Sequence, residues 1–282
     1  MMRGCLVAAS VVLVLAGAAL AVATPSPLAG ARTYLVESQQ ADGGFAEAGS
    51  PSDPALTSWA ALGLVASGGG ADARSRALDY LQAHEDAAAS ETDVALQTLA
   101  RTALGDHPEA LLARLRAGVQ TGPLVNAAIW AILALRGARE PVPPGLVRSV
   151  LASQSRSGGW SWHRGGNPDS NDTAAALEAL RAAGVTGSPV VRGLAALRTF
   201  RNTDGGYALT TGRESDAQST AWAIQGLAAW GKRPGAATWR FLARLRRADG
   251  SYGYSARYAT TPVWVTAQVA VALSGRAFPL LR

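Results

Sequence analysis

The sequence predicts an all-helical protein made of six helix-pair repeats. Ala, Leu and Arg dominate the composition and β-branched runs are scarce beyond the N-terminus, which favours helix. Six Ala- and Leu-rich blocks each end on a Gly, the residue that most often supplies a left-handed helix C-cap. Four repeats also carry a Gly-rich turn that ends on an aromatic residue. Spacing of this regularity is typical of stacked supersecondary units.

The first 23 residues have the pattern of an export signal. Arg3 provides a positive charge, residues 5–20 form a small and apolar run, and Ala21-Val22-Ala23 matches a cleavage site. The apolar run is close to membrane-spanning length, so an uncleaved anchor is the alternative. With cleavage, residues 24–282 form a single secreted or cell-envelope domain, which meets the membrane only through the signal segment.

The six blocks are each three helical turns long, and we expect them to form the inner helix of each pair. In chain order they run Thr57 to Gly68, Val94 to Gly105, Asn126 to Gly137, Thr173 to Gly184, Thr220 to Gly231 and Trp264 to Gly275. An outer helix, a turn and a loop precede each block, which gives twelve helices. Pro141, Pro143 and Pro144 indicate the start of the fourth outer helix.

The Gly-aromatic turns share a polar residue four positions before their first Gly. We expect this side chain to hydrogen-bond to the turn's backbone while the aromatic ring packs back on the outer helix. The polar residues are Gln39, Gln154, Arg201 and Arg246, and the turns are Gly43-Gly44-Phe45, Gly158-Gly159-Trp160, Gly205-Gly206-Tyr207 and Gly250-Ser251-Tyr252.

The pattern Tyr34-Leu35-x-x-x-Gln39-x-x-x-Gly43-x-Phe45 resembles the QW repeat of squalene–hopene cyclases and protein prenyltransferase β-subunits, the prenyltransferase/squalene oxidase repeat. The resemblance spans about residues 28–282, although repeats two and three are degenerate. It implies an α6/α6 toroid, an α/α barrel whose inner helices line a central cavity. The same toroid also serves binding proteins, so the fold alone does not imply catalysis.

The resemblance also points to a stretch that would carry catalysis. Squalene–hopene cyclases protonate their substrate with the middle Asp of an Asp-x-Asp-Asp-Thr-Ala motif, and the matching stretch here begins at Asp169. Asn171 occupies the position of the acid, and an amide does not donate a proton as a carboxylic acid does. These cyclases also use two toroid domains, whereas one is predicted here. Catalysis would require Asp169 or Asp172 to take over the role, with His163 nearby.

A capping role explains the acidic residues equally well. Asp53, Asp169 and Asp216 each lie four residues before the Thr of an inner block, and Asp is a preferred N-cap. Inner-helix N-termini surround one mouth of a toroid, so these capping carboxylates would also line the entrance to a ligand site.

Neither a metal, a cofactor nor a nucleic acid is expected. Prenyltransferases bind zinc through Asp, Cys and His, but Cys5 leaves with the signal and the three His residues have no paired ligand spacing. The net charge of +6 comes from scattered Arg residues without a recognisable nucleic-acid-binding module.

The Trp residues are the remaining candidates for ligand contact. Trp59, Trp130, Trp222 and Trp264 fall early in the inner blocks, and Trp162 flanks the fourth turn. Trp at such positions is either core or the wall of an apolar pocket. We expect the site at repeats four and five, because their loops are the longest.

The expected function is therefore non-catalytic binding of a bulky, largely apolar small molecule in the central cavity. An isoprenoid-like ligand or a corrinoid would suit, since vitamin B12 carriers share the toroid, and a partner protein could close the cavity mouth. The alternative is a terpenoid cyclase or prenyltransferase-like enzyme. A glycan-acting toroid is a more distant possibility.

Overall fold

The computed structural model describes residues 26–117 and 124–281. Within these ranges it confirms the all-helical prediction, with twelve α-helices, a short 3-10 turn η1 (Glu85–Ala87) and isolated β-bridges in place of strands. The predicted signal segment lies outside the described residues. None of the helices that are described has the length and apolar character needed to cross a bilayer.

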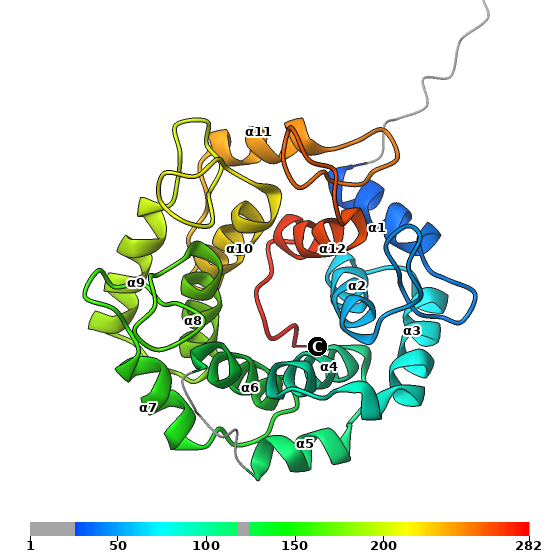
Figure 1. Ribbon diagram of the computed structural model, residues 1–282, viewed down its shortest axis with the longest axis horizontal. Helices are drawn as coiled ribbons and strands as arrows, with labels where there is room; N and C mark the ends of the chain where they lie inside the picture. The colour runs from blue at the N-terminus through cyan, green and yellow to red at the C-terminus, as the bar shows by residue number, and fades with distance from the viewer. Residues whose placement is uncertain (1–25, 118–123, 282) are drawn as a thin grey trace, which may run out of the picture.

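The helices form two concentric rings, which is the predicted α6/α6 toroid (Figure 1). The inner ring consists of α2 (Pro54–Ser67), α4 (Glu91–Leu104), α6 (Val125–Gly137), α8 (Ser170–Ala182), α10 (Ala217–Ala228) and α12 (Pro262–Leu273). The outer ring consists of α1 (Pro27–Glu37), α3 (Ala71–Ala83), α5 (Glu109–Arg116), α7 (Pro144–Ala152), α9 (Ser188–Thr199) and α11 (Ala236–Leu245).

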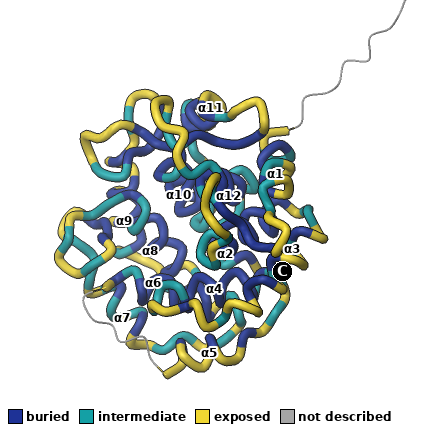
Figure 2. The backbone as a smooth tube through the Cα atoms, turned by 45° about the vertical axis from the view of Figure 1, so that its right-hand side comes forward, coloured by how far each residue is buried: buried dark blue, intermediate teal, exposed yellow. Residues whose placement is uncertain are grey.

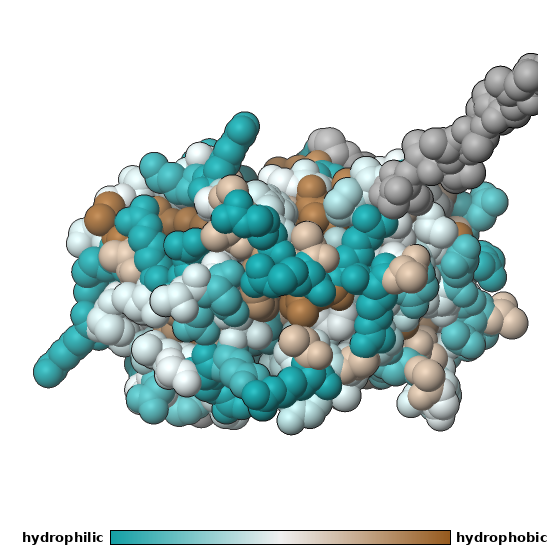
Figure 3. Space-filling model, turned by 90° about the horizontal axis from the view of Figure 1, so that it is seen from above, coloured by the Kyte–Doolittle hydropathy of each residue, from teal (hydrophilic) through white to brown (hydrophobic). Residues whose placement is uncertain are grey.

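The two rings differ in how their sequences meet water. The inner helices are buried along most of their length, whereas exposed residues concentrate in the outer helices and the loops (Figure 2). Seen from the side of the ring that carries α11, the surface is mainly hydrophilic with small hydrophobic spots (Figure 3). Helices that are apolar on all sides require cover all round, and the outer ring supplies it.

The Gly-aromatic turns join each repeat to the next outer helix. The Gln39 side-chain amide donates to the Gly43 carbonyl and to the Ala73 carbonyl of α3, both at 2.8 Å. Gln154 repeats this arrangement with the Gly158 and Pro189 carbonyls, also at 2.8 Å. The predicted role of the Gln residue is confirmed, and each amide also reaches the following repeat.

The turns are fixed in the same way to the inner helix that follows. In repeats one, four, five and six, the backbone N–H of the turn's aromatic residue donates to a Thr hydroxyl at 2.9–3.0 Å. These Thr residues are Thr57, Thr173, Thr220 and Thr266.

Two of the predicted block boundaries are wrong by two residues. In the sixth repeat Thr266, and not Trp264, is equivalent to the Thr residues of the other repeats. In the third repeat Gly137 is the last residue of α6, and the left-handed residue that follows the helix is Arg139, with φ 63°. Regular spacing of Gly residues suggested the wrong register, because this repeat ends without a Gly in the left-handed position.

The ring closes between its first and last repeats. The turn at Gly250 lies against Gly30 of α1, where an added Cβ would be 2.4 Å from the Gly30 carbonyl oxygen. In the inner ring, Gly63 of α2 packs directly on the backbone of Ala267 in α12. Closure buries the apolar sides that an open stack of repeats would expose.

Candidate functional site

The N-termini of neighbouring inner helices meet at one end of the ring, which we call the N-terminal mouth. The first N–H groups of α6, α8 and α10 donate to the loop that precedes the next inner helix, at the carbonyls of Trp162, Leu209 and Tyr254. As predicted, Asp53, Asp169 and Asp216 cap α2, α8 and α10, with side-chain oxygens 2.7–2.8 Å from backbone N–H groups.

Three Trp rings meet on the axis below this mouth. Trp59, Trp130 and Trp222 are each the sixth residue of an inner helix, in repeats one, three and five. Their ring centroids are 5.4, 5.9 and 5.7 Å apart, and each pair is nearly perpendicular. This edge-to-face geometry is favourable for aromatic pairs.

The segment after α12 completes the aromatic cluster from the opposite side. It runs inside the ring (Figure 1) and places the Phe278 ring 6.0–6.3 Å from all three Trp rings. The Phe278 backbone N–H donates to the carboxyl group of Glu178 on α8 at 2.6 Å. Burial raises the pKa of Glu178 well above its ordinary range.

The prediction of an open central cavity lined by Trp residues is therefore wrong at this level of the ring. Trp59, Trp130 and Trp222 are buried and contact one another, so side chains of the protein itself occupy the axis. The core interpretation of these three residues is the correct one. Trp264 differs from them, because it is only half-buried and belongs to the mouth.

An apolar groove of about 380 Å³ lies at the N-terminal mouth, on the seam where α12 meets α2. We call it the seam groove. Its lining residues are Glu47, Ser50, Pro51, Asp53, Ala55, Leu56, Trp59, Thr261 and Trp264. It thus brings together three of the predicted ligand residues, two Trp side chains and one Asp, but between repeats six and one instead of at repeats four and five.

The carboxylates of the seam groove are already engaged. The two oxygens of Glu47 accept the N–H groups of Val263 at 3.2 Å and Trp264 at 2.9 Å. Glu47 therefore caps α12, whose own N-cap residue Thr261 has a left-handed backbone, with φ 51°, and no side-chain cap bond. Asp53 is similarly bound to the Leu56 N–H. What the groove offers a ligand is mainly its apolar surface.

The structure places the predicted acid candidates Asp169 and Asp172 side by side. Their side chains share a hydrogen bond, and Asp169 also accepts the Asp172 backbone N–H at 2.8 Å. Burial and then the neighbouring Asp169 raise the pKa of Asp172 to about 8, and burial also raises the pKa of Asp169. The pair therefore holds a proton at neutral pH.

The other predicted residues near this pair do not join it. The His163 ring bonds to the Arg164 carbonyl at 3.1 Å, and in the described part of the chain no hydrogen bond or ion pair links it to either Asp. The Asn171 amide oxygen accepts the Ser170 hydroxyl at 3.1 Å. Trp162 is 53% exposed and lies edge-on to His163 at the rim.

Asp216 is the most buried of the capping acids. It accepts the Ser219 N–H and hydroxyl at 2.7 and 2.8 Å and bonds with Tyr254. Burial raises its pKa despite these bonds. This set of contacts is that of a structural cap. Across the described residues, no cluster of His, Cys, Asp and Glu side chains is arranged to hold a metal ion.

Several functional neighbours were missed in the sequence. Glu47 caps a helix more than 200 residues away, so no local pattern signals it. Phe278 and Glu178 meet only because the last segment turns into the ring. The residue just before a helix-starting Pro262 gave one usable signal, since Thr261 precedes a Pro at a position where an N-cap is expected.

Comparison with known proteins supports the fold. The apo structure of the type II terpene cyclase MstE from Scytonema matches with a TM-score of 0.64 at 15% identity, over 88% of this chain and 96% of that chain. MstE in complex with geranylgeranyl dihydroxybenzoate matches with a TM-score of 0.59 at 16% identity, over 88% and 95%. A glycosidase matches with a TM-score of 0.64 at 13% identity, over 88% and 95%. No protein-family model and no curated protein sequence matches the chain. The likeness establishes a terpene cyclase-like and glycosidase-like toroid.

Proposed function

We propose that this protein binds, without cyclising it, a largely apolar small molecule of isoprenoid type in the seam groove. The observation that carries the proposal is a groove of about 380 Å³ with two Trp side chains, Trp59 and Trp264, in its wall. That volume falls at the lower end of small-molecule sites. Since the carboxylates at its edge cap helices, the ligand meets apolar surface.

The size of the groove narrows the ligand class. A corrinoid is far larger than this volume, and the aromatic cluster of Trp59, Trp130, Trp222 and Phe278 occupies the axis where a deeper site would lie. A linear isoprenoid chain can instead lie along the groove against Leu56 and Pro51. The resemblance to terpene cyclases is consistent with this ligand class.

The proposal is tested by calorimetric titration with farnesol. The parent protein should bind it, and Trp264→Ala should weaken binding by roughly a few-fold to tenfold, the usual loss for one aromatic contact. Trp239→Ala is the matched control, because Trp239 lies on the outer helix α11 away from the groove. Equal affinities of the parent and Trp264→Ala would exclude the seam groove as the site.

Export is part of the same proposal. The signal-like segment supports it, and mass spectrometry of the protein recovered from the medium or the cell envelope should give a chain that begins near Thr24. Recovery of a chain that retains Met1 in the membrane fraction would contradict cleavage.

Acid catalysis is the second candidate function, favoured by the proton held between Asp169 and Asp172. A protonated carboxyl of this kind could donate its proton to an alkene of a polyprene and leave a carbocation. Incubation with squalene or geranylgeranyl diphosphate, followed by gas chromatography with mass detection, tests this. Cyclic products that disappear in a folded Asp172→Asn variant would establish the enzyme in place of the binding protein.

The same pair does not suit glycoside hydrolysis. Glycosidases need two carboxyl groups separated by about 5 Å or more, so that a sugar or a water fits between them. Asp169 and Asp172 are in direct hydrogen-bond contact. The glycosidase likeness is therefore a likeness of fold.

A further inference from the structure

The inner helix α6 ends in an unusual residue. The first left-handed residue after each of the other five inner helices is a Gly, namely Gly68, Gly105, Gly184, Gly231 and Gly275. After α6 it is Arg139, with φ 63°. A side chain in this conformation is strained, because its Cβ crowds the following carbonyl oxygen. Strained residues of this kind concentrate at functional sites.

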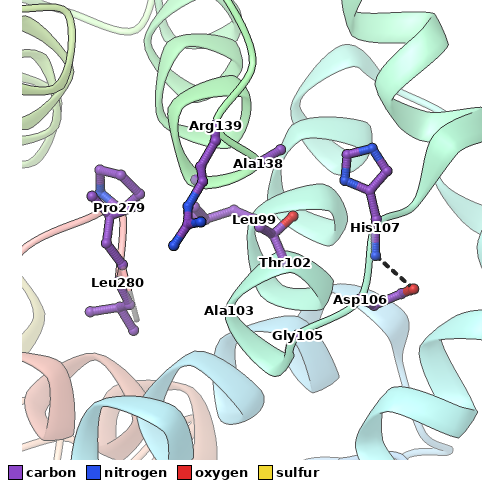
Figure 4. A pocket seen from close by; sticks show the side chains of 12 residues that line it. Leu99, Thr102, Ala103, Gly105, Asp106, His107, Ala138, Arg139, Pro279 and Leu280 are labelled. Carbon is purple, nitrogen blue, oxygen red and sulfur yellow. Dashed lines mark hydrogen bonds between the residues drawn. The ribbon is translucent and has the colours of Figure 1, made fainter.

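Arg139 opens onto a hollow of about 330 Å³ at the end of the ring opposite the N-terminal mouth. The hollow lies between the C-terminal ends of α4 and α6 and the segment Pro279–Leu281 (Figure 4). Arg139 reaches from the end of α6 toward Leu99, with Pro279 and Leu280 on its other side. Leu99 and Leu280 are buried residues that give the hollow an apolar floor.

The charges around this hollow are unequally committed. The Asp106 carboxylate accepts Arg101 Nε at 2.6 Å and the His107 N–H at 2.8 Å. The neighbouring Glu140 pairs with Arg116. Within the described ranges, the Arg139 guanidinium takes part in no hydrogen bond or ion pair.

The polar groups beside Arg139 add to this picture. The Thr102 hydroxyl lies in the wall of the hollow and has no hydrogen-bond partner. The His107 ring, which is also part of the lining, lies 3.5 Å from Glu109. The hollow thus combines one uncommitted cation, an unpartnered hydroxyl and an apolar floor.

We propose that this hollow binds a small carboxylic acid with an apolar tail, such as a medium-chain fatty acid. The planar guanidinium of Arg139 matches a carboxylate in a two-point contact. The tail would rest on Leu99, Ala103 and Leu280. This site is separate from the seam groove and does not depend on its function.

Calorimetric titration with octanoate and with octanol tests the site. Octanoate should bind with a Kd below about 1 mM, and octanol, which lacks the charge, at least about tenfold more weakly. Arg139→Gly should reduce octanoate affinity at least about tenfold. The same variant should raise the Tm by about 2–4 °C, because Gly relieves the left-handed strain.

Two control variants show whether octanoate depends on Arg139 itself. Arg148→Ala removes an exposed cation from α7 and should leave both octanoate affinity and Tm unchanged. Trp264→Ala, in the seam groove, should also leave octanoate affinity unchanged. Unaltered octanoate affinity in Arg139→Gly, equal affinity for octanol, or no octanoate binding by the parent protein would each overturn the proposal.

Discussion

Trp59, Trp130 and Trp222 meet on the axis because they hold the same position on alternate inner helices. Small or aliphatic side chains hold that position on the helices between them, at Leu96, Ala175 and Ala267. Three large rings on alternate helices can therefore converge without overcrowding. The sequence showed that Trp59 and Trp222 are equivalent, but the wrong register of the third block hid Trp130.

Trp222→Ala should act on stability more than on ligand affinity. The ring is 4% exposed and contacts Trp59, Trp130 and Phe278, so its loss leaves a cavity at the axis. We expect a fall of about 3–5 kcal/mol in the free energy of unfolding, measured by urea denaturation. Trp162→Ala, at an exposed rim position, should change it by less than about 0.5 kcal/mol. Similar effects of the two substitutions would contradict the account of the cluster.

Asp172 should make stability depend on pH. Its pKa is raised to about 8 in the folded protein, so the folded state binds the proton more tightly than the unfolded chain. Its contribution to stability is present below the ordinary Asp pKa and is lost as pH rises toward 8.

Asp172→Asn removes this titration. Relative to the parent protein, the variant should gain stability on the order of 2 kcal/mol between pH 4 and pH 8, measured by denaturant titration at each pH. A difference between the two proteins that does not change with pH would contradict the raised pKa.

The elements themselves were predictable where local chemistry defines them. Caps such as Asp53, the Gly-aromatic turns and the start of α7 at Pro144 depend on residues a few positions apart. The ends of α6 and α12 were not predictable in the same way. Arg139 takes a conformation that usually belongs to Gly, and α12 is capped by Glu47 from another repeat.

Gly205 should be intolerant of a side chain. Its φ is 93°, and an added Cβ would lie 2.5 Å from the Ala237 carbonyl oxygen at the start of α11. Gly205→Val should therefore lower the free energy of unfolding by at least about 2 kcal/mol. Thermal unfolding followed by circular dichroism measures this.

Gly212→Ala provides a control for backbone strain alone. Gly212 has φ 86° and no heavy atom within 4 Å of an added Cβ. The control should cost about 1 kcal/mol. If Gly205→Val costs no more than this, the close approach between the turn and α11 does not stabilise the ring.

At the scale of the whole molecule, closure and the filling of the axis depend on contacts between distant parts of the sequence. Six repeats in sequence predicted a closed ring, and Gly63 against Ala267 confirms it. The filling of the ring by Phe278 could not be predicted, because the last segment carries no repeat pattern. The predicted open cavity failed for this reason, and the apolar ligand site moves to the seam.

Glu47→Gln should loosen the closure of the ring. The carboxylate accepts two N–H groups at the N-terminus of α12, where a negative charge is also favoured by the helix dipole. We expect a loss of about 0.5–2 kcal/mol, seen as faster hydrogen exchange in the first turn of α12. Glu214→Gln, which alters a surface ion pair with Arg257, should leave that exchange unchanged. Unaltered exchange in Glu47→Gln would show that Glu47 is not the cap that closes the ring.

The central claim is that an apolar ligand lies against Trp264 and Trp59 in the seam groove. The eight Trp indole N–H groups of the ¹⁵N-labelled protein report on it separately during a titration with farnesol. The account predicts saturable shifts of the Trp264 and Trp59 signals, while the signal of Trp239 on α11 stays in place. A Trp264 signal that does not move at saturating farnesol, or shifts spread evenly over all the Trp signals, would contradict it.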